Sequence, residues 1–286
     1  MKIASRRSFL KASGAAAAAT LTGSRLLSAT TPSMPIGLQL YSVRELLPKD
    51  FDGTLRQLGA AGFKEVEAAG YFNKTAAEFR HAMDQAGLRC ISTHHPLSQL
   101  KASEDQLIEY GHQLGLEYIV CPSAMHRDPA AKGQLTLDDW RYSASELNRI
   151  GEKVKKAGMT LGYHNHTPEF GSEGGVVFYD ELLRLTDPKL VVFEMDCGWV
   201  YAAGQDPVTY LKRSPGRFPL LHVKAMAKEA NGGYHSVVMG HGAPGYKPIF
   251  AAATGLKHYF IEQEEFTGDI LDELRQDAAF MRKFSY

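Results

Sequence analysis

The stretch VKKAGMTLGYHNH, at 154–166, holds the pattern that decides the fold of this chain. A helix-type segment leads to a glycine, which can adopt the left-handed conformation that ends a helix, and a short apolar run follows and ends in a histidine. The same succession of helix, glycine and strand recurs at 55–70, 79–94, 110–123 and 252–264. A repeated unit of this kind predicts parallel strands joined by helical crossovers.

The strand-type runs number eight when the whole chain is read in this way. We expect strands at 36–41, 64–69, 89–94, 117–121, 159–164, 190–195, 219–224 and 258–263. Eight strands that alternate with helices, with no glycine-rich dinucleotide motif after the first, favour a single (β/α)8 TIM barrel (class α/β) over a doubly wound sheet. We expect the glycine-rich segments 171–177 and 228–236 to be loops at the catalytic rim.

The first thirty residues resemble a twin-arginine export signal. Arg6 and Arg7 precede an alanine-rich apolar stretch at 12–27, which is too short for a membrane span. We therefore divide the chain into a signal at 1–30 and a barrel domain at 31–286. The protein is expected to be periplasmic or secreted, with the signal cleaved near 28–31 and no stable membrane anchor afterwards.

The charge balance changes when this segment is removed. The segment carries five positive residues and no acids, so the mature chain has 27 basic against 32 acidic residues. A mildly acidic chain with no basic block argues against a nucleic-acid ligand. Three cysteines, an odd number, lie in or at the ends of strands, which predicts buried thiols rather than disulfides. They are Cys90, Cys121 and Cys197.

Four side chains that commonly bind metals stand at the ends of the last four expected strands. Because the carboxyl ends of the strands meet at one face of a barrel, we expect these side chains to converge. Two imidazoles and two carboxylates suit one divalent ion, namely Mn, Zn, Co, Fe or Mg, and leave room for substrate oxygens. The expected ligands are His164, Asp196, His222 and Glu262.

Side-chain alternation in strands groups further polar residues on the inner face of the barrel. The resulting pairs are Gln39 with Tyr41, Glu65 with Glu67, Ser92 with His94, His164 with His166, Glu194 with Asp196, His222 with Lys224, and Glu262 with Glu264.

Six phrases spread over essentially the whole mature length resemble the xylose-isomerase-like, sugar phosphate isomerase/epimerase family. They are IGLQLYSVRE, GFKEVEAAGYFNKTAAEFRHAMDQAGL, YHNHTPEF, MDCGWVYAAGQDPVTYL, LLHVKAM and YFIEQEEF. In that family the metal ligands come from strands five to eight, and the last three match Asp196, His222 and Glu262. Strand five departs from the pattern, since His164 stands where many members have glutamate, as in a YHNH-type branch that includes inosose-dehydratase-like and keto-glycoside-processing relatives.

The resemblance implies enolate chemistry on a keto-sugar or 3-keto-glycoside. A metal that binds a carbonyl and an adjacent hydroxyl acidifies the α-proton and stabilises the resulting enediolate. Reprotonation gives isomerisation or epimerisation, and loss of a β-substituent gives a lyase or hydratase reaction, including one on inosose-like substrates. In the family's ketose epimerases two glutamates, from strands five and eight, carry the protons. Only the second of these is present here, as Glu262. Candidate bases are His94, His166, Glu169 and Lys224, with Lys224 also an electrophile, and candidate substrate contacts are Tyr41, Arg44, Glu67, Glu169 and Trp199.

The export signal and the composition limit the kinds of molecule that we expect the protein to bind. With no glycine-rich phosphate cradle and no arginine cluster, we expect a neutral mono- or disaccharide derivative as substrate. The same barrel serves apurinic-site endonucleases, but those need more metal ligands and a basic rim. A non-catalytic periplasmic sugar-binding protein is the alternative from another class. Barrels of the resembled family often pair through their helical faces or rim loops, so the resemblance also suggests a homodimer.

Overall fold

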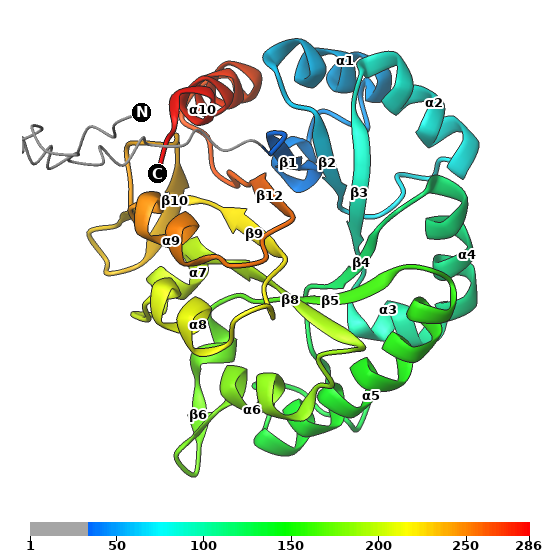
Figure 1. The fold of residues 1–286 in the computed structure, drawn as a ribbon, viewed down its shortest axis with the longest axis vertical. Helices are drawn as coiled ribbons and strands as arrows, with labels where there is room; N and C mark the ends of the chain where they lie inside the picture. The colour runs from blue at the N-terminus through cyan, green and yellow to red at the C-terminus, as the bar shows by residue number, and fades with distance from the viewer. Residues whose placement is uncertain (1–33) are drawn as a thin grey trace, which may run out of the picture.

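The computed structural model describes residues 34–286, so the expected signal lies outside the described residues. Eight parallel strands form a closed barrel in the order β1-β12-β9-β8-β5-β4-β3-β2. Figure 1 shows the helices around the strands, with the first strand lying beside the last. The barrel strands are β1 (Gly37–Gln39), β2 (Glu65–Ala68), β3 (Arg89–His94), β4 (Tyr118–Cys121), β5 (Thr160–His164), β8 (Val191–Asp196), β9 (Leu220–Val223) and β12 (His258–Ile261). The predicted single TIM barrel is thereby confirmed.

The helices follow the strands along the chain, with short 3-10 turns after β1 and β5. The α-helices are α1 (Phe51–Ala61), α2 (Ala76–Ala86), α3 (Leu97–Ala102), α4 (Glu104–Leu114), α5 (Leu137–Lys156), α6 (Phe178–Leu185), α7 (Cys197–Ala202), α8 (Pro207–Arg213), α9 (Tyr246–Ala252) and α10 (Ile270–Lys283), and the 3-10 turns are η1 (Leu40–Val43) and η2 (Pro168–Phe170). Among the residues that the structure describes, no helix is long and apolar enough to cross a membrane.

The glycines of the repeated unit end the helices as expected. Gly62, Gly87 and Gly115 are the C-caps of α1, α2 and α4, and each has a left-handed backbone. Gly158, just beyond α5, and Gly255, just beyond α9, also have positive φ angles. Because an L side chain is strained in this conformation, glycine allows each helix to stop and the chain to turn into the next strand.

Two segments that we expected to be simple loops contain β-hairpins. The segment 171–177 includes β6 (Ser172–Glu173) paired with β7 (Val176–Val177), and 228–236 connects and partly forms β10 (Ala225–Lys228) and β11 (Tyr234–Val237). The sequence pattern detected only the glycines at the tips of these hairpins. The strands on either side lie outside the helix–glycine–strand unit of the barrel, so only the structure reveals the pairing.

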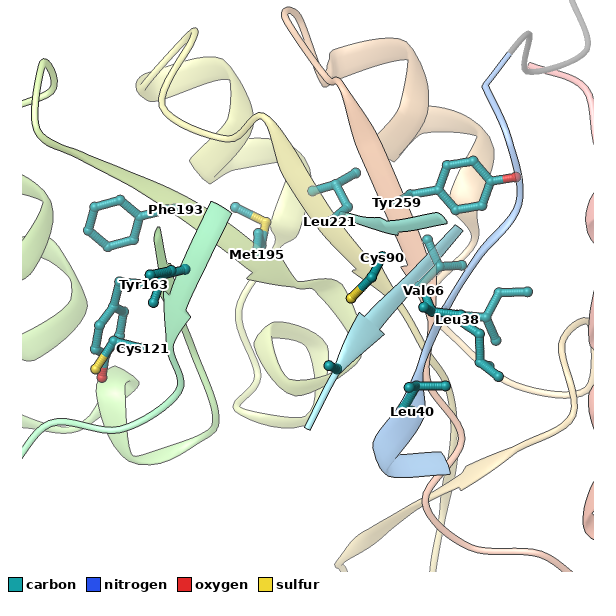
Figure 2. Packing of buried hydrophobic residues seen from close by; sticks show 14 of the residues in the cluster. Leu38, Leu40, Val66, Cys90, Cys121, Tyr163, Phe193, Met195, Leu221 and Tyr259 are labelled. Carbon is teal, nitrogen blue, oxygen red and sulfur yellow. The ribbon is translucent and has the colours of Figure 1, made fainter. Parts of the chain in front are cut away.

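Buried apolar side chains form two clusters, one on each face of the barrel wall. The larger lies between strands and helices, and Figure 2 shows some of its members, including Leu38, Val66 and Phe193, which come from strands distant in sequence. The smaller contains Leu220 and Phe260, which alternate with outward-facing neighbours and fill the barrel interior. Along β8 and β9 the same alternation places polar residues on the inner face of the barrel, above these apolar side chains. All three cysteines are free and buried, as predicted.

Candidate active site

Four side chains with metal-binding groups meet at the carboxyl end of the barrel. His164 is the last residue of β5 and Asp196 the last of β8, while Glu262 follows β12 directly. His222, in β9, pairs in register with Asp196 on the neighbouring strand. All four residues are buried, and one ligand atom of each lies within 4.8 Å of those of the others. The structure therefore brings together the four side chains that the sequence assigns to a metal.

The donor atoms fit a divalent cation that would replace the proton on His222, whose pKa Glu194 and Glu262 raise well above its usual range although burial opposes the charged form. Burial, together with the charges of His222 and His166, holds the pKa of His164 well below its usual range, so its imidazole is neutral and can donate a lone pair. His222 Nδ1 lies 3.1 Å from Glu262 Oε2 and 3.8 Å from Asp196 Oδ2. A mixed set of imidazole nitrogen and carboxylate oxygen suits Mn, Fe, Co or Zn.

A buried ammonium group borders this set of ligands. Lys224 Nζ lies 2.9 Å from Asp196 Oδ2 and 2.8 Å from Glu262 Oε2, and it also pairs with Glu264. Burial opposes the charged form of Lys224, but the neighbouring carboxylates raise its pKa above the ordinary value. Burial likewise opposes ionisation of Glu262, yet Lys224 and His222 keep its pKa well below the usual range. The site thus concentrates negative charge that attracts cations.

A second layer of carboxylates lies on the inner side of the two histidine ligands. Glu194 Oε2 is 3.1 Å from His164 Nδ1 and 3.1 Å from His222 Nε2, while Glu67 Oε1 is 2.8 Å from His222 Nε2. Glu194 Oε1 has no hydrogen-bond partner among residues 34–286. Carboxylates in such positions accept the second N–H of a ligand histidine and so orient its ring toward the metal. In the sequence, side-chain alternation groups Glu194 with Asp196 but predicts no function for Glu194.

His94 joins this second layer from the end of β3. Its Nε2 lies 2.7 Å from Glu67 Oε1 and 2.8 Å from Glu194 Oε2. Although burial opposes the charged form, the charge of Glu67 and the hydrogen bonds to both carboxylates raise the pKa of His94 to about 9. His94, Glu194, His164 and His222 also satisfy the spacing of a metal-binding group, which overlaps the first group at its two shared histidines.

A cavity of about 370 Å³ opens above the ligands. His164 and Glu262 reach it from below, and His94 and His166 stand in its wall. A volume of this size suits one sugar ring. The full lining consists of Tyr41, Ala69, His94, Pro96, Pro122, Ser123, His164, His166, Glu262 and Glu264.

The rim near β1 is built around an arginine. Arg44 donates to the backbone oxygens of Tyr41 and Glu264, and its guanidinium lies 4.3 Å from the centre of the Tyr41 ring. Tyr41 is the only large apolar residue of the described chain that is strongly exposed, at 43%. Arg44 therefore holds two cavity residues in place, while Tyr41 offers an aromatic face to a ligand.

The other expected substrate contacts lie away from the lining of this cavity. Glu67 is fully buried beneath His94 and His222. Trp199 donates its backbone N–H to Asp196 Oδ1, and its ring lies 4.6 Å from Lys224 Nζ. Glu169 accepts from the Tyr163 hydroxyl and the His166 backbone, and burial raises its pKa. Glu67 and Trp199 thus support the site from behind, and Glu169 lines a neighbouring cavity. Alternation predicts which face a side chain takes but not its depth.

One cavity residue was grouped by the alternation but given no role. Glu264 lines the cavity and pairs with Lys224, two residues beyond the ligand Glu262. The phrase EQE supplied the signal, since residues two apart in an extended segment face the same way. Glu264 therefore belongs among the candidate site residues.

Comparisons with known proteins agree with this arrangement. A family model described as xylose isomerase-like TIM barrel matches residues 55–284, and a model of the twin-arginine translocation signal matches residues 4–23. An inosose dehydratase from Lacticaseibacillus casei is 24% identical over 265 residues, covering 82% of this chain and 86% of the relative.

Solved structures give the same result. A sugar phosphate isomerase/epimerase from Parabacteroides distasonis superposes with a TM-score of 0.74 at 26% identity, covering 89% of this chain and 96% of that one. A 3-keto-D-glucoside 4-epimerase from E. coli has a TM-score of 0.67 at 17% identity, covering 88% of this chain and all of that one, which is a likeness of fold. The match to the export signal shows that the chain carries a twin-arginine signal, which directs it to the periplasm or the exterior.

Proposed function

The chain belongs to the xylose isomerase-like TIM-barrel family, and from that premise we propose that it is a divalent-metal-dependent enzyme that forms an enediolate from a keto-sugar or 3-keto-glycoside. The observation that carries the proposal is the convergence of His164, Asp196, His222 and Glu262 beneath a cavity that fits one sugar ring. The printed activities of the inosose dehydratase and sugar isomerase/epimerase relatives support the same reaction class.

The metal, when bound by these four residues, would polarise a substrate carbonyl and an adjacent hydroxyl and so acidify the α-proton. His166 stands in the cavity wall and is the side chain placed to accept that proton, while His94, whose pKa is raised to about 9 by Glu67 and Glu194, is protonated near neutral pH and can act only as a proton donor. Glu262 also reaches the cavity, as a ligand whose second oxygen can face the substrate. Tyr41 provides an apolar face against the sugar ring.

Lys224 supports the developing negative charge rather than removing a proton. Its ammonium group is fully buried and is held among Asp196, Glu262 and Glu264, so it presents a fixed positive charge behind the reacting oxygens. A positive charge already in place before the reaction stabilises an oxyanion without reorganisation.

The enediolate can then follow either of two courses. Reprotonation on carbon gives isomerisation or epimerisation. Expulsion of the β-substituent gives dehydration or glycoside cleavage, and the dehydratase names among the curated relatives favour this second candidate. His164 in place of a glutamate removes one of two symmetric proton carriers, which makes a two-glutamate epimerisation less suited to this chain.

The export signal constrains the substrate to molecules outside the cytoplasm. Neither cavity residues nor sequence provide an arginine cluster or a glycine-rich cradle for a phosphate. We therefore propose a neutral carbohydrate. A homodimer remains a prediction, and so does the absence of a nucleic-acid partner.

The test is hydrogen exchange in deuterium oxide. The metal-loaded protein is incubated with a panel of keto-sugars and 3-keto-glycosides, and products are followed by NMR and mass spectrometry. Metal-dependent deuterium uptake next to the carbonyl, or an elimination product that absorbs in the ultraviolet, is the expected result. The variant that combines His164→Ala with Glu262→Gln should show neither.

Two outcomes would change the interpretation. Tight metal binding with no exchange on any sugar would contradict the enzymatic proposal and favour a sugar-binding protein. Exchange that persists undiminished in the double variant would show that these ligands do not form the reactive centre.

A further inference from the structure

A second, larger cavity of about 1210 Å³ adjoins the one above the metal ligands. The two cavities share Pro122, Ser123 and His166 in their walls, so a ligand anchored over the metal ligands can extend directly into the second space. A single sugar ring needs only the first cavity, and the second therefore provides for an additional group attached to the sugar.

Two long connections at the carboxyl end of the barrel form the walls of this second cavity. They run from 122 to 136, between β4 and α5, and from 165 to 177, between β5 and α6. Both are much longer than the roughly two to six residues typical of such connections, and long ordered loops are commonly functional. Figure 1 shows the β6–β7 hairpin of the second connection projecting from the ring of helices beside α6.

Hydrogen bonds hold both connections in place without a ligand. Asp139, in the first turn of α5, accepts from His126 Nδ1 at 3.0 Å and from the Arg127 backbone at 2.8 Å. Glu173, in the hairpin, accepts from the Leu137 backbone at 2.8 Å and so ties the second connection to the start of α5. The walls are thus pre-organised, which lowers the entropy cost of binding.

The chemistry of the lining favours a flat apolar group. Trp140 and Phe178 stack at 5.4 Å with planes 15° apart, and Leu135 and Pro168 add further apolar surface. The lining contains no lysine or arginine among the described residues. Its two carboxylates are engaged elsewhere, Glu169 with Tyr163 and Glu173 with Leu137. Polar side chains of the two connections, among them Gln134, Thr167 and Ser172, also line the cavity, so a second sugar is the competing occupant. The Trp140–Phe178 pair favours an aromatic ring, which needs mainly apolar contact.

One polar group in this wall is unused. Trp140 is 3% exposed, and its indole N–H has no hydrogen-bond partner among residues 34–286. A buried indole N–H usually finds an acceptor, so the hydrogen-bonding capacity of this side of the cavity wall is incompletely satisfied.

From these features we propose that the second cavity binds an aromatic aglycone, and that the substrate is an aryl-bearing 3-keto-glycoside whose sugar lies over the metal ligands. This assignment rests on the proposed function, because the sugar position is taken from it. It adds the chemical class of the leaving group, and it assigns Phe178 and Trp140 to the recognition of that group.

Kinetics with matched glycosides test the aglycone site. The benzyl, methyl and glucosyl 3-keto-β-glucosides are compared, because benzyl and methyl alcohols are leaving groups of similar basicity. Burial of the phenyl ring should raise kcat/KM for the benzyl compound about 10- to 100-fold over the methyl compound. Phe178→Ala should reduce this ratio to within a few-fold of one, by lowering kcat/KM for the benzyl compound more than for the methyl compound. Phe280→Ala, a half-buried aromatic on α10 outside both cavities, is the matched control and should preserve the ratio.

Fluorescence gives an independent readout of binding. The chain has two tryptophans, so Trp199→Phe leaves Trp140 as the single reporter. Unoxidised benzyl β-glucoside should shift the emission of Trp140, and methyl β-glucoside should not. The shift should disappear when Phe178→Ala is added.

The outcomes separate this proposal from the enzymatic one. Absence of turnover on every glycoside, together with a benzyl-specific shift that depends on Phe178, would reject the proposed reaction and keep the aglycone site. Equal kcat/KM for benzyl and methyl compounds, with no emission change, would overturn the aglycone site. A glucosyl compound preferred over the benzyl one would overturn its aromatic character.

Discussion

At the scale of single residues, Glu194 is a buried carboxylate placed to tune the proposed metal site, because it contacts the imidazoles of two of the four proposed ligands. It approaches both His164 and His222 at 3.1 Å through one oxygen, and in His222 it faces Nε2 while Glu262 and Asp196 face Nδ1. In that position it fixes which nitrogen of each imidazole carries the proton and raises the basicity of the other.

Glu194→Gln should therefore weaken metal binding about 10- to 100-fold, because a neutral amide is a poorer acceptor for both imidazole N–H groups. Competition with a chromophoric chelator measures the change in Kd. Glu117→Gln, which alters an exposed carboxylate just before β4, is the control and should leave the Kd unchanged. Equal affinities in the two variants would refute the orienting role of Glu194.

Asp277 is a second residue whose environment has a measurable effect. It is fully buried in α10, where Oδ1 accepts from the Met239 backbone at 2.7 Å. Burial, together with the charge of Glu273, raises its pKa to about 7. Its neutral form is favoured in the folded state, so its contribution to stability is complete below pH about 4 and is lost as the pH rises through about 7.

Asp277→Asn should prevent this loss of stability with rising pH, since an amide cannot ionise. The variant should be more stable than the wild type at pH 8 by about 1–3 kcal/mol, and the difference should vanish or reverse near pH 4. Urea unfolding at pH 4, 6 and 8 measures this. If the stability difference does not vary with pH, Asp277 does not titrate as described.

At the scale of elements, close packing of helices around the barrel places strong demands on particular glycines. A Cβ added to Gly59 in α1 would lie 2.0 Å from the backbone oxygen of Ala86 at the end of α2. A Cβ added to Gly111 in α4 would lie 3.2 Å from the flexible Met159 sulfur. The two positions are both helical, but only the first faces a rigid backbone.

Gly59→Ala should destabilise the fold by about 1–3 kcal/mol, because overpacking forces the two helices apart. Gly111→Ala should be neutral or stabilising by up to about 1 kcal/mol, since alanine is the better helix former and Met159 can move aside. Chemical denaturation of both variants provides the comparison. Similar effects of the two substitutions would show that α1 and α2 are not in backbone contact.

The strands illustrate what an element pattern can and cannot reveal. The eight barrel strands were predicted to within about two residues at each end, because each begins just after a helix-ending glycine or a turn and carries apolar residues on its outer face. The short hairpins β6–β7 and β10–β11 escaped prediction, because none of their strands follows an α-helix and they lie outside the helix–glycine–strand unit of the barrel.

At the scale of the whole molecule, a metal bound by the four proposed ligands would join the second half of the barrel to itself. Because the complete ligand set exists only in the folded chain, saturating metal should raise the stability by about 2.7 kcal/mol at a metal concentration one hundred times Kd. For a domain of this size that is a rise in Tm of about 5–10 °C.

Calorimetry of the chelator-treated protein with and without Mn²⁺ or Zn²⁺ measures that rise. The variant that combines His164→Ala with Glu262→Gln should lose most of it while unfolding with the same cooperativity. A shift that survives in this variant would place the metal elsewhere.

Export is also a property of the whole chain. The paired Arg6 and Arg7 are the residues that the twin-arginine route reads. Replacement of both by lysine keeps the charge but should retain nearly all of the protein in the cytoplasm. Fractionation followed by immunoblotting distinguishes the two outcomes, and normal export of the double variant would point to another route.

The sequence by itself determined the barrel, the export signal and the four residues that meet as candidate metal ligands. Each of these depends on a local period or on the identity of a residue at a strand end, and in a closed parallel barrel all strand ends share one face. Only the tertiary structure decided that His94, His166 and Glu264 border the cavity while Glu67 and Lys224 lie beneath or behind it. Alternation sets the face of a side chain, but its depth depends on the stagger of neighbouring strands, and the aglycone cavity depends on two loops that meet only after folding.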